Sequence, residues 1–131
     1  MVFILFSAFG TDFSASDFVS KHGLKTGSIW SKGQALRSGS LHKDAGFSLN
    51  LDEAQTTNAV VPLVESFLKE NQGWFAALRE QPVERLLHLG VTVGDASSFA
   101  PCLEFSLSFL KLLVEERIEL HISAYPTRDP E

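Results

Sequence analysis

The chain has little cysteine and no pattern of metal ligands. It has 131 residues and a single cysteine, Cys102, and no Cys and His residues spaced as in a structural zinc site. One cysteine cannot form an internal disulfide, so a reducing, cytoplasmic setting fits best. Pro101 and Leu103 flank Cys102 in place of basic residues, which predicts a buried, inert thiol. We expect neither a metal nor a cofactor.

Long hydrophobic runs are also lacking. Residues 2–9 are apolar, but no basic flank precedes them and no small-residue cleavage site follows, so we expect a strand covered on both faces rather than a signal peptide. The run at 105–114 is broken by polar residues and is shorter than the roughly 20 apolar residues that span a bilayer. The sequence therefore predicts a soluble protein that does not associate with membranes.

The common catalytic motifs are missing too. The sequence contains no phosphate-cradling Gly-x-x-x-x-Gly-Lys-Ser/Thr loop, no Gly-x-Gly-x-x-Gly, no Gly-x-Ser-x-Gly and no His-Glu-x-x-His. Nucleotide, hydrolase and metalloprotease readings lose their main support, and the sequence favours a non-enzymatic role.

Carboxylates are absent from residues 18–43, although the chain as a whole is acidic. The five cations of this segment leave the rest of the chain at −10, against −5 for the whole. An acidic protein lacks the broad basic footprint of a general nucleic-acid binder. An anionic partner would therefore have to meet this one segment.

The composition is that of a globular domain, with 44% hydrophobic and 21% charged residues. The length suits a single domain, 1–131, and eleven phenylalanines predict an aromatic core. Alternating and helical patterns predict elements in the order β-α-β-β-α-β-α-β. The strands are expected at 2–9, in a hairpin at 24–46, and at 47–51, 87–93 and 118–124, and the helices at 15–22, 58–80 and 107–116. This order favours an α+β sandwich, a mostly antiparallel sheet with helices on one face.

Local signals set the helix ends. Ser14 with Asp17 resembles a capping box, Gly23 suits a left-handed helix end, and Ser106 is a candidate N-cap. Gly73 is expected to break the middle helix. The last helix is expected to present Leu110, Leu113 and Val114 to the core.

The element order and three short patterns resemble a mostly bacterial family of small domains catalogued as domain of unknown function 4279. The patterns are His22-Gly23-Leu24-Lys25-Thr26 with Trp30-Ser31-Lys32-Gly33, then Phe105-Ser106 before Leu110-Lys111-Leu112-Leu113, and the terminal run from Ile118 to Tyr125. Lys25 stands where family members often have proline. The resemblance implies the fold and no catalytic residue.

Two groups of residues are candidate sites. The first is Lys25, Trp30, Lys32 and Arg37 on the Gly-rich hairpin, where Trp30 either stacks on a ligand beside the cations or anchors the hairpin on the core. We favour the anchor. Glu115 and Glu116 end the last helix, where the macrodipole disfavours anions, and are expected to be exposed.

The second group is His88, Glu119, His121 and Tyr125, with Thr92 beside them. All lie opposite the aliphatic positions of their strands, so neighbouring strands would place them on one polar sheet face. Such a set can supply a general base, an orienting carboxylate and a hydrogen-bond donor, or bind a divalent metal. An ordinary solvated face is the plainer interpretation, and the one we favour.

The leading hypothesis is a cytoplasmic binding module that meets a protein partner or a small anionic ligand through the basic hairpin. An immunity-type protein that neutralises a toxin is one specific form, since such proteins are small and acidic; its contact could instead use the acidic remainder. The alternative is a small enzyme with its site on the polar sheet face. The oligomeric state is left open.

Overall fold

A five-stranded sheet with the strand order β2-β3-β1-β4-β5 forms the middle of the molecule. The computed structural model describes residues 1–94 and 102–126, so the loop expected at 94–102 lies outside the described residues apart from its two ends. The strands are β1 (Val2–Gly10), β2 (Ser28–Trp30), β3 (Ala45–Asn50), β4 (Glu84–Val93) and β5 (Ile118–Pro126).

Three of the four strand pairs are antiparallel. β1 pairs with β3 and β4, and β2 pairs with β3 across the Gly-rich hairpin. β4 and β5 run parallel, which requires a crossover connection, and α4 (Leu107–Glu115) lies on that connection. The predicted α+β class, with a mostly antiparallel sheet, is confirmed.

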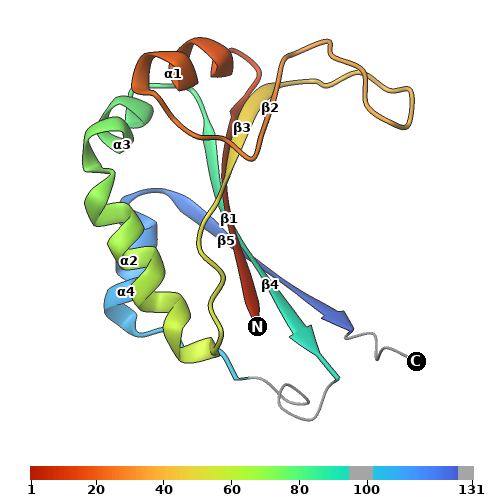
Figure 1. Ribbon diagram of the computed structural model, residues 1–131. Coiled ribbons are helices and arrows are strands. Elements are labelled where there is room, and N and C mark those ends of the chain that lie inside the picture. The colour runs from red at the N-terminus through yellow and green to blue at the C-terminus, as the bar shows by residue number, and fades with distance from the viewer. Residues whose placement is uncertain (95–101, 127–131) are drawn as a thin grey trace.

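All the helices cover the same face of this sheet (Figure 1). Besides α4 they are α1 (Ala15–His22), α2 (Val60–Glu70) and α3 (Gln72–Arg79), with a short 3-10 turn at Thr57–Ala59. No helix of the described residues lies on the opposite face. We call it the open face.

The core between sheet and helices is aromatic, as the composition predicts. Phe6 and Phe47 on the sheet and Phe75 on α3 are fully buried. Trp74 stacks on Phe75 with ring centroids 4.3 Å apart, and Phe6 lies 5.1 Å from Phe75. Rings that meet in tilted and offset geometries add stabilisation beyond the area that they bury.

Two of the predicted helix ends, at Gly23 and Ser106, are confirmed. Gly23 ends α1 in the left-handed conformation with φ 62°, and the hydroxyl of Ser106 accepts a hydrogen bond from Phe109 N at 3.2 Å. Ser14 differs, because its hydroxyl donates to Asp17 Oδ2 at 2.7 Å and caps no backbone N–H.

Three finer expectations are wrong. The middle helix breaks at Asn71 rather than Gly73, because the Asn71 side chain donates to Phe67 O and accepts from Trp74 Nε1. On α4 the buried residues are Phe109 and Leu113, while Val114 is 74% exposed. β1 is covered on both faces only along part of its length. Phe3 is 44% exposed because the open face carries no helix there.

Candidate functional site

Strand register places the predicted polar residues together on the open face. His88 pairs with His121 across the parallel β4–β5 ladder, and Thr92 pairs with Tyr125. Paired residues of neighbouring strands point to the same side of a sheet, and Glu119 shares that side with His121 two residues later. Leu87 and Leu89 point the other way and are buried against the helices.

The open face is not uniformly polar. A hollow of about 400 Å³ lies over β1 and β4, and its lining includes Phe3, Leu5, His88, Gly90 and Tyr125. Phe3 and Tyr125 are 44% and 48% exposed, so two large rings border the hollow. The Tyr125 ring lies over Gly90, where an added Cβ would approach Cε2 to 2.9 Å.

The histidines do not converge on one point. His88 Nε2 lies 2.9 Å from the hydroxyl of Ser123, whereas His121 Nε2 lies 3.5 Å from Glu119 Oε2. Each ring therefore has a partner of its own. Across residues 1–94 and 102–126 there is no group of three or more His, Cys, Asp or Glu side chains that could hold a metal ion.

The segment 31–44, which we call the arm, extends from the sheet between β2 and β3. Its base is fixed by Trp30, whose Nε1 donates to Asp44 Oδ1 at 2.9 Å. The indole also stacks on His42 with centroids 5.9 Å apart. It lies against Gly46, where an added Cβ would approach Cζ2 to 2.6 Å. These contacts match an anchoring role for Trp30.

Cations are carried by the exposed outer part of the arm. Lys32 and Arg37 fall within residues 31–40, all of which are exposed, and Lys43 lies near the return to β3. Two backbone hydrogen bonds close the arm on itself, from Gly33 N to His42 O and from His42 N to Gln34 O, both 2.9 Å. Lys25 lies outside the arm, beside α1 and the end of β3.

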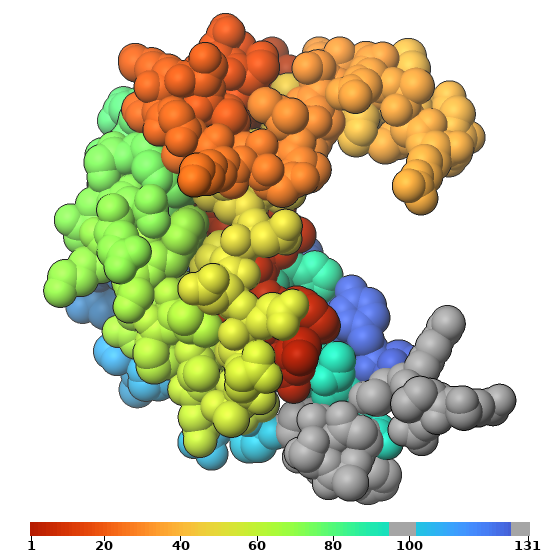
Figure 2. Space-filling model, viewed as in Figure 1, coloured from red at the N-terminus to blue at the C-terminus, as the bar shows by residue number. Residues whose placement is uncertain are grey.

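The arm projects on the open-face side of the sheet, away from the helices (Figure 1). Figure 2 shows the molecule hollowed between the arm, drawn in orange, and the ends of β1, β4 and β5. The body is therefore concave. A cationic arm stands on one side of the concavity, and a sheet surface with exposed rings forms another.

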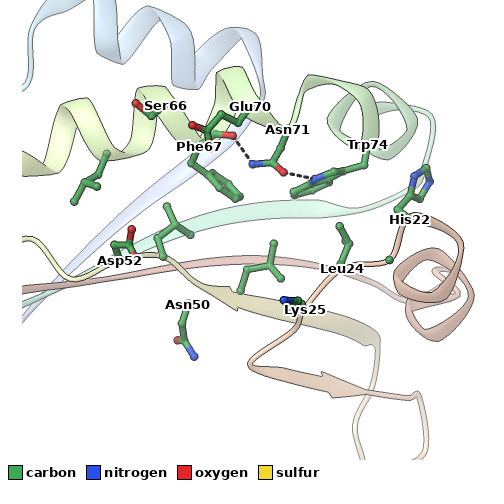
Figure 3. Close-up of a pocket in the computed structure, with 14 residues that line it drawn as sticks. His22, Leu24, Lys25, Asn50, Asp52, Ser66, Phe67, Glu70, Asn71 and Trp74 are labelled. Atoms are coloured by element: carbon green, nitrogen blue, oxygen red, sulfur yellow. Dashed lines mark hydrogen bonds between the residues drawn. The ribbon is translucent and has the colours of Figure 1, made fainter.

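A second cavity, of about 640 Å³, lies between the end of α1, the end of β3 and helices α2 and α3. Lys25 borders it, together with Asp52, Ser66 and Glu70 (Figure 3). Asn71 is engaged with Phe67 and Trp74, as the dashed lines in the figure mark. This cavity carries charges of both signs, and of the predicted hairpin residues it is lined by Lys25 and not by Trp30, Lys32 or Arg37.

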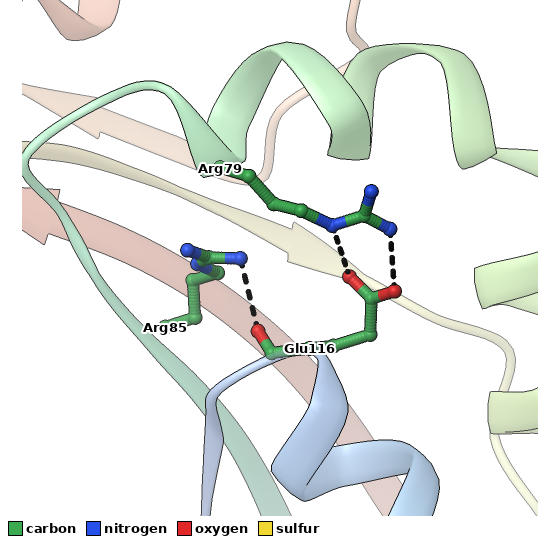
Figure 4. Close-up of polar contacts among 3 residues, drawn as sticks. All are labelled: Arg79, Arg85 and Glu116. Carbon is green, nitrogen blue, oxygen red and sulfur yellow. Dashed lines mark hydrogen bonds and ion pairs between the residues drawn. The ribbon is translucent and has the colours of Figure 1, made fainter.

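An arginine cluster that the sequence analysis missed lies where α3 and α4 end and β4 begins. Arg79 holds the carboxylate of Glu116 with two hydrogen bonds, Nε to Oε2 at 3.1 Å and Nη2 to Oε1 (Figure 4). Glu116 is thus paired and its side chain only 16% exposed, so the expectation of an exposed charge is wrong for it. The hydrogen bond to Glu116, and then its charge, raises the pKa of Arg79.

Arg85 is the buried member of this cluster, only 5% exposed. Its Nη1 donates to the backbone oxygen of Glu116 at 2.9 Å. Burial lowers the pKa of Arg85, Glu116 opposes that shift, and the positive charges of Arg117 and Arg79 add to it. These residues come from three separate elements, so no short sequence motif could have indicated them.

The prediction of a buried thiol is wrong, because Cys102 is exposed. Its Sγ lies 3.9 Å from Glu104 Oε1, a partner with negative charge. Since a nearby cation is what activates a cysteine nucleophile, this neighbour gives no support for a catalytic thiol.

Comparison of the chain with models of protein families, with curated proteins and with solved structures gave no match. Within the described residues, no helix has the length and apolar character needed to cross a membrane.

Proposed function

We propose that this chain is a binding domain that holds an acidic, partly apolar peptide segment of a partner protein in the concavity between the arm and the open face. The single observation that carries the proposal is the pairing of a cationic arm with exposed rings on one concave side. Lys32 and Arg37 offer charge, while Phe3 and Tyr125 offer apolar surface.

The chemistry of the arm and of the exposed rings on the open face indicates the kind of ligand. Exposed apolar rings on an open sheet are typical of interaction surfaces, and aromatic side chains are enriched at the centres of protein interfaces. Cations at the rim steer an acidic partner and raise its association rate. An extended peptide that alternates acidic and apolar side chains can contact the cations of the arm and the rings of the open face at the same time.

A toxin-neutralising role in the cytoplasm is one specific form of this proposal. It rests on the small size and on the net charge of −5. The proposal differs from the hypothesis formed on sequence in two respects. Trp30 holds the base of the arm rather than standing at the centre of the contact, and the proposed contact surface extends onto the sheet.

The experiment measures fluorescence anisotropy of a labelled peptide of alternating Glu and Leu residues. We expect saturable binding that weakens as salt is added, because screening acts on exposed charges. The double variant Lys32→Glu/Arg37→Glu should bind about tenfold more weakly or worse, because like charges then face the peptide.

The matched control is Lys69→Glu/Lys111→Glu, which makes the same change in net charge on helices α2 and α4, behind the sheet. This control should bind like the unaltered protein. Equal losses of peptide affinity in both double variants would show that only the net charge matters, which would refute the proposal. Equal affinity for a peptide of alternating Lys and Leu would refute it as well.

A small enzyme on the open face is the second candidate, favoured by the 2.9 Å contact between His88 Nε2 and Ser123 Oγ. A histidine against a serine hydroxyl is the arrangement that activates an oxygen nucleophile. Hydrolysis of p-nitrophenyl acetate that disappears in both His88→Ala and Ser123→Ala would support it. Hydrolysis no faster than in buffer would exclude an esterase of this kind.

A further inference from the structure

Three arginines border one cavity at the end of the sheet where β1 ends and β4 begins. The cavity has a volume of about 490 Å³, and Arg79, Arg85 and Arg117 all line it. Only one of the three has an ion-pair partner among the described residues, since Glu116 pairs with Arg79. Arg85 and Arg117 are left without a carboxylate partner in the part of the chain that the structure describes.

Of these two arginines, Arg85 loses more free energy by having no carboxylate partner. Burial removes water from its guanidinium, and the carboxylate of Glu116 is held by Arg79 rather than by Arg85. Its contact with the Glu116 carbonyl satisfies one N–H, and a cation at the end of α4 is favoured by the helix dipole. Yet Arg85 Nε is buried with no hydrogen-bond partner. Arg85 therefore borders the cavity with a guanidinium whose hydrogen bonds the protein satisfies only in part.

Arg117 adds an independent sign of constraint. Within the described residues it is the only residue other than glycine with positive φ, at 54°. It follows directly on the end of α4, where glycine is the usual residue because any Cβ is strained in the left-handed region. The left-handed conformation is a common way for a helix to end, so the unusual feature is that an arginine rather than a glycine adopts it. The strain here is borne by a residue that also lines the cavity.

We propose that this cavity is a binding site for a single small oxyanion, with a phosphate group as the preferred ligand, held by Arg85 and Arg117 beside the Arg79–Glu116 pair. Guanidinium groups match the oxygens of phosphate with two parallel hydrogen bonds each. Two carboxylates, Asp44 and Glu84, also border the cavity. They disfavour a long polyanion and limit the site to one anionic group.

The proposal is independent of the peptide surface. It is tested by titrating the 15N-labelled protein with inorganic phosphate at constant ionic strength, set with sodium chloride, and following the Nε–Hε signals of the arginines. We expect saturable shifts of the Arg85 and Arg117 signals and none beyond the chloride control for Arg37. Acetate should give weaker binding. Shifts no larger than those in chloride, or tighter binding of acetate, would overturn the assignment to phosphate.

Two variants separate ligand binding from folding. Arg117→Gln should weaken phosphate binding about tenfold, because a charged hydrogen-bond donor is lost. Lys111→Gln removes the same charge from α4, away from the cavity lining, and should leave binding unchanged. Arg117→Gly should also lose binding while its unfolding temperature stays equal or rises, since glycine relieves the strain at φ 54°. Unchanged phosphate affinity in both Arg117 variants would overturn the proposal.

Discussion

The backbone and the Trp30 ring approach Gly46 closely at the base of the arm. This position lies on β3 opposite Phe9 and Trp30, on the open face. A Cβ added there would approach the backbone oxygen of Ala8 and Trp30 Cζ2 to 2.6 Å. The strand pairing and the seating of the indole thus depend on the absence of a side chain.

Gly46→Ala should therefore lower the free energy of unfolding by about 1–3 kcal/mol, the usual cost of overpacking. Gly73→Ala is the matched control, because nothing lies within 4 Å of its added Cβ and the residue belongs to helix α3. It should raise stability by about 0.5–1 kcal/mol. Urea unfolding followed by tryptophan fluorescence measures both, and the same sign for the two variants would contradict this reading of β3.

Single residues also show which contacts can be predicted from the sequence and which cannot. Gly23 and Ser106 act within one turn of helix, so their roles were predictable from the sequence alone. Glu116 was not, because its partners Arg79 and Arg85 come from α3 and β4, far away along the chain. Contacts of that kind follow from the packing of elements and leave no local pattern.

At the scale of elements, the alternation of apolar residues identified the strands and the face of each. It correctly grouped His88, Glu119, His121 and Tyr125, because period-two alternation is a property of each strand by itself. It did not identify the hollow beside Phe3, which depends on β1 lying next to β4. For α4 the apolar residues surround much of the helix, so the sequence alone chose the wrong buried stripe.

The arm is the element on which the proposed function rests, and the Trp30–Asp44 hydrogen bond should limit its motion. Asp44→Ala removes the acceptor at a cost of about 1 kcal/mol, so hydrogen exchange at the amides of Gly33 and His42 should become about fivefold faster. Asp44→Asn keeps an oxygen acceptor and should exchange at nearly the original rate. Identical exchange in all three proteins would show that this hydrogen bond does not hold the arm.

At the scale of the whole molecule, the proposed function divides the two faces of the sheet between stability and binding. The helices and the aromatic core occupy one face and supply stability. The arm and the exposed rings lie on the other, where the proposal places the ligand. That the chain is similar to the uncharacterised bacterial family stays a prediction.

Chemical-shift mapping tests this division most directly. The 15N-labelled protein is titrated with the peptide of alternating Glu and Leu residues, and backbone amide shifts are followed. We expect the largest shifts at Phe3, Leu5, His88 and Gly90 and along the arm, with the amides of α2 and α4 unchanged. Shifts centred on the helices, or spread evenly over the molecule, would contradict a binding site in the concavity.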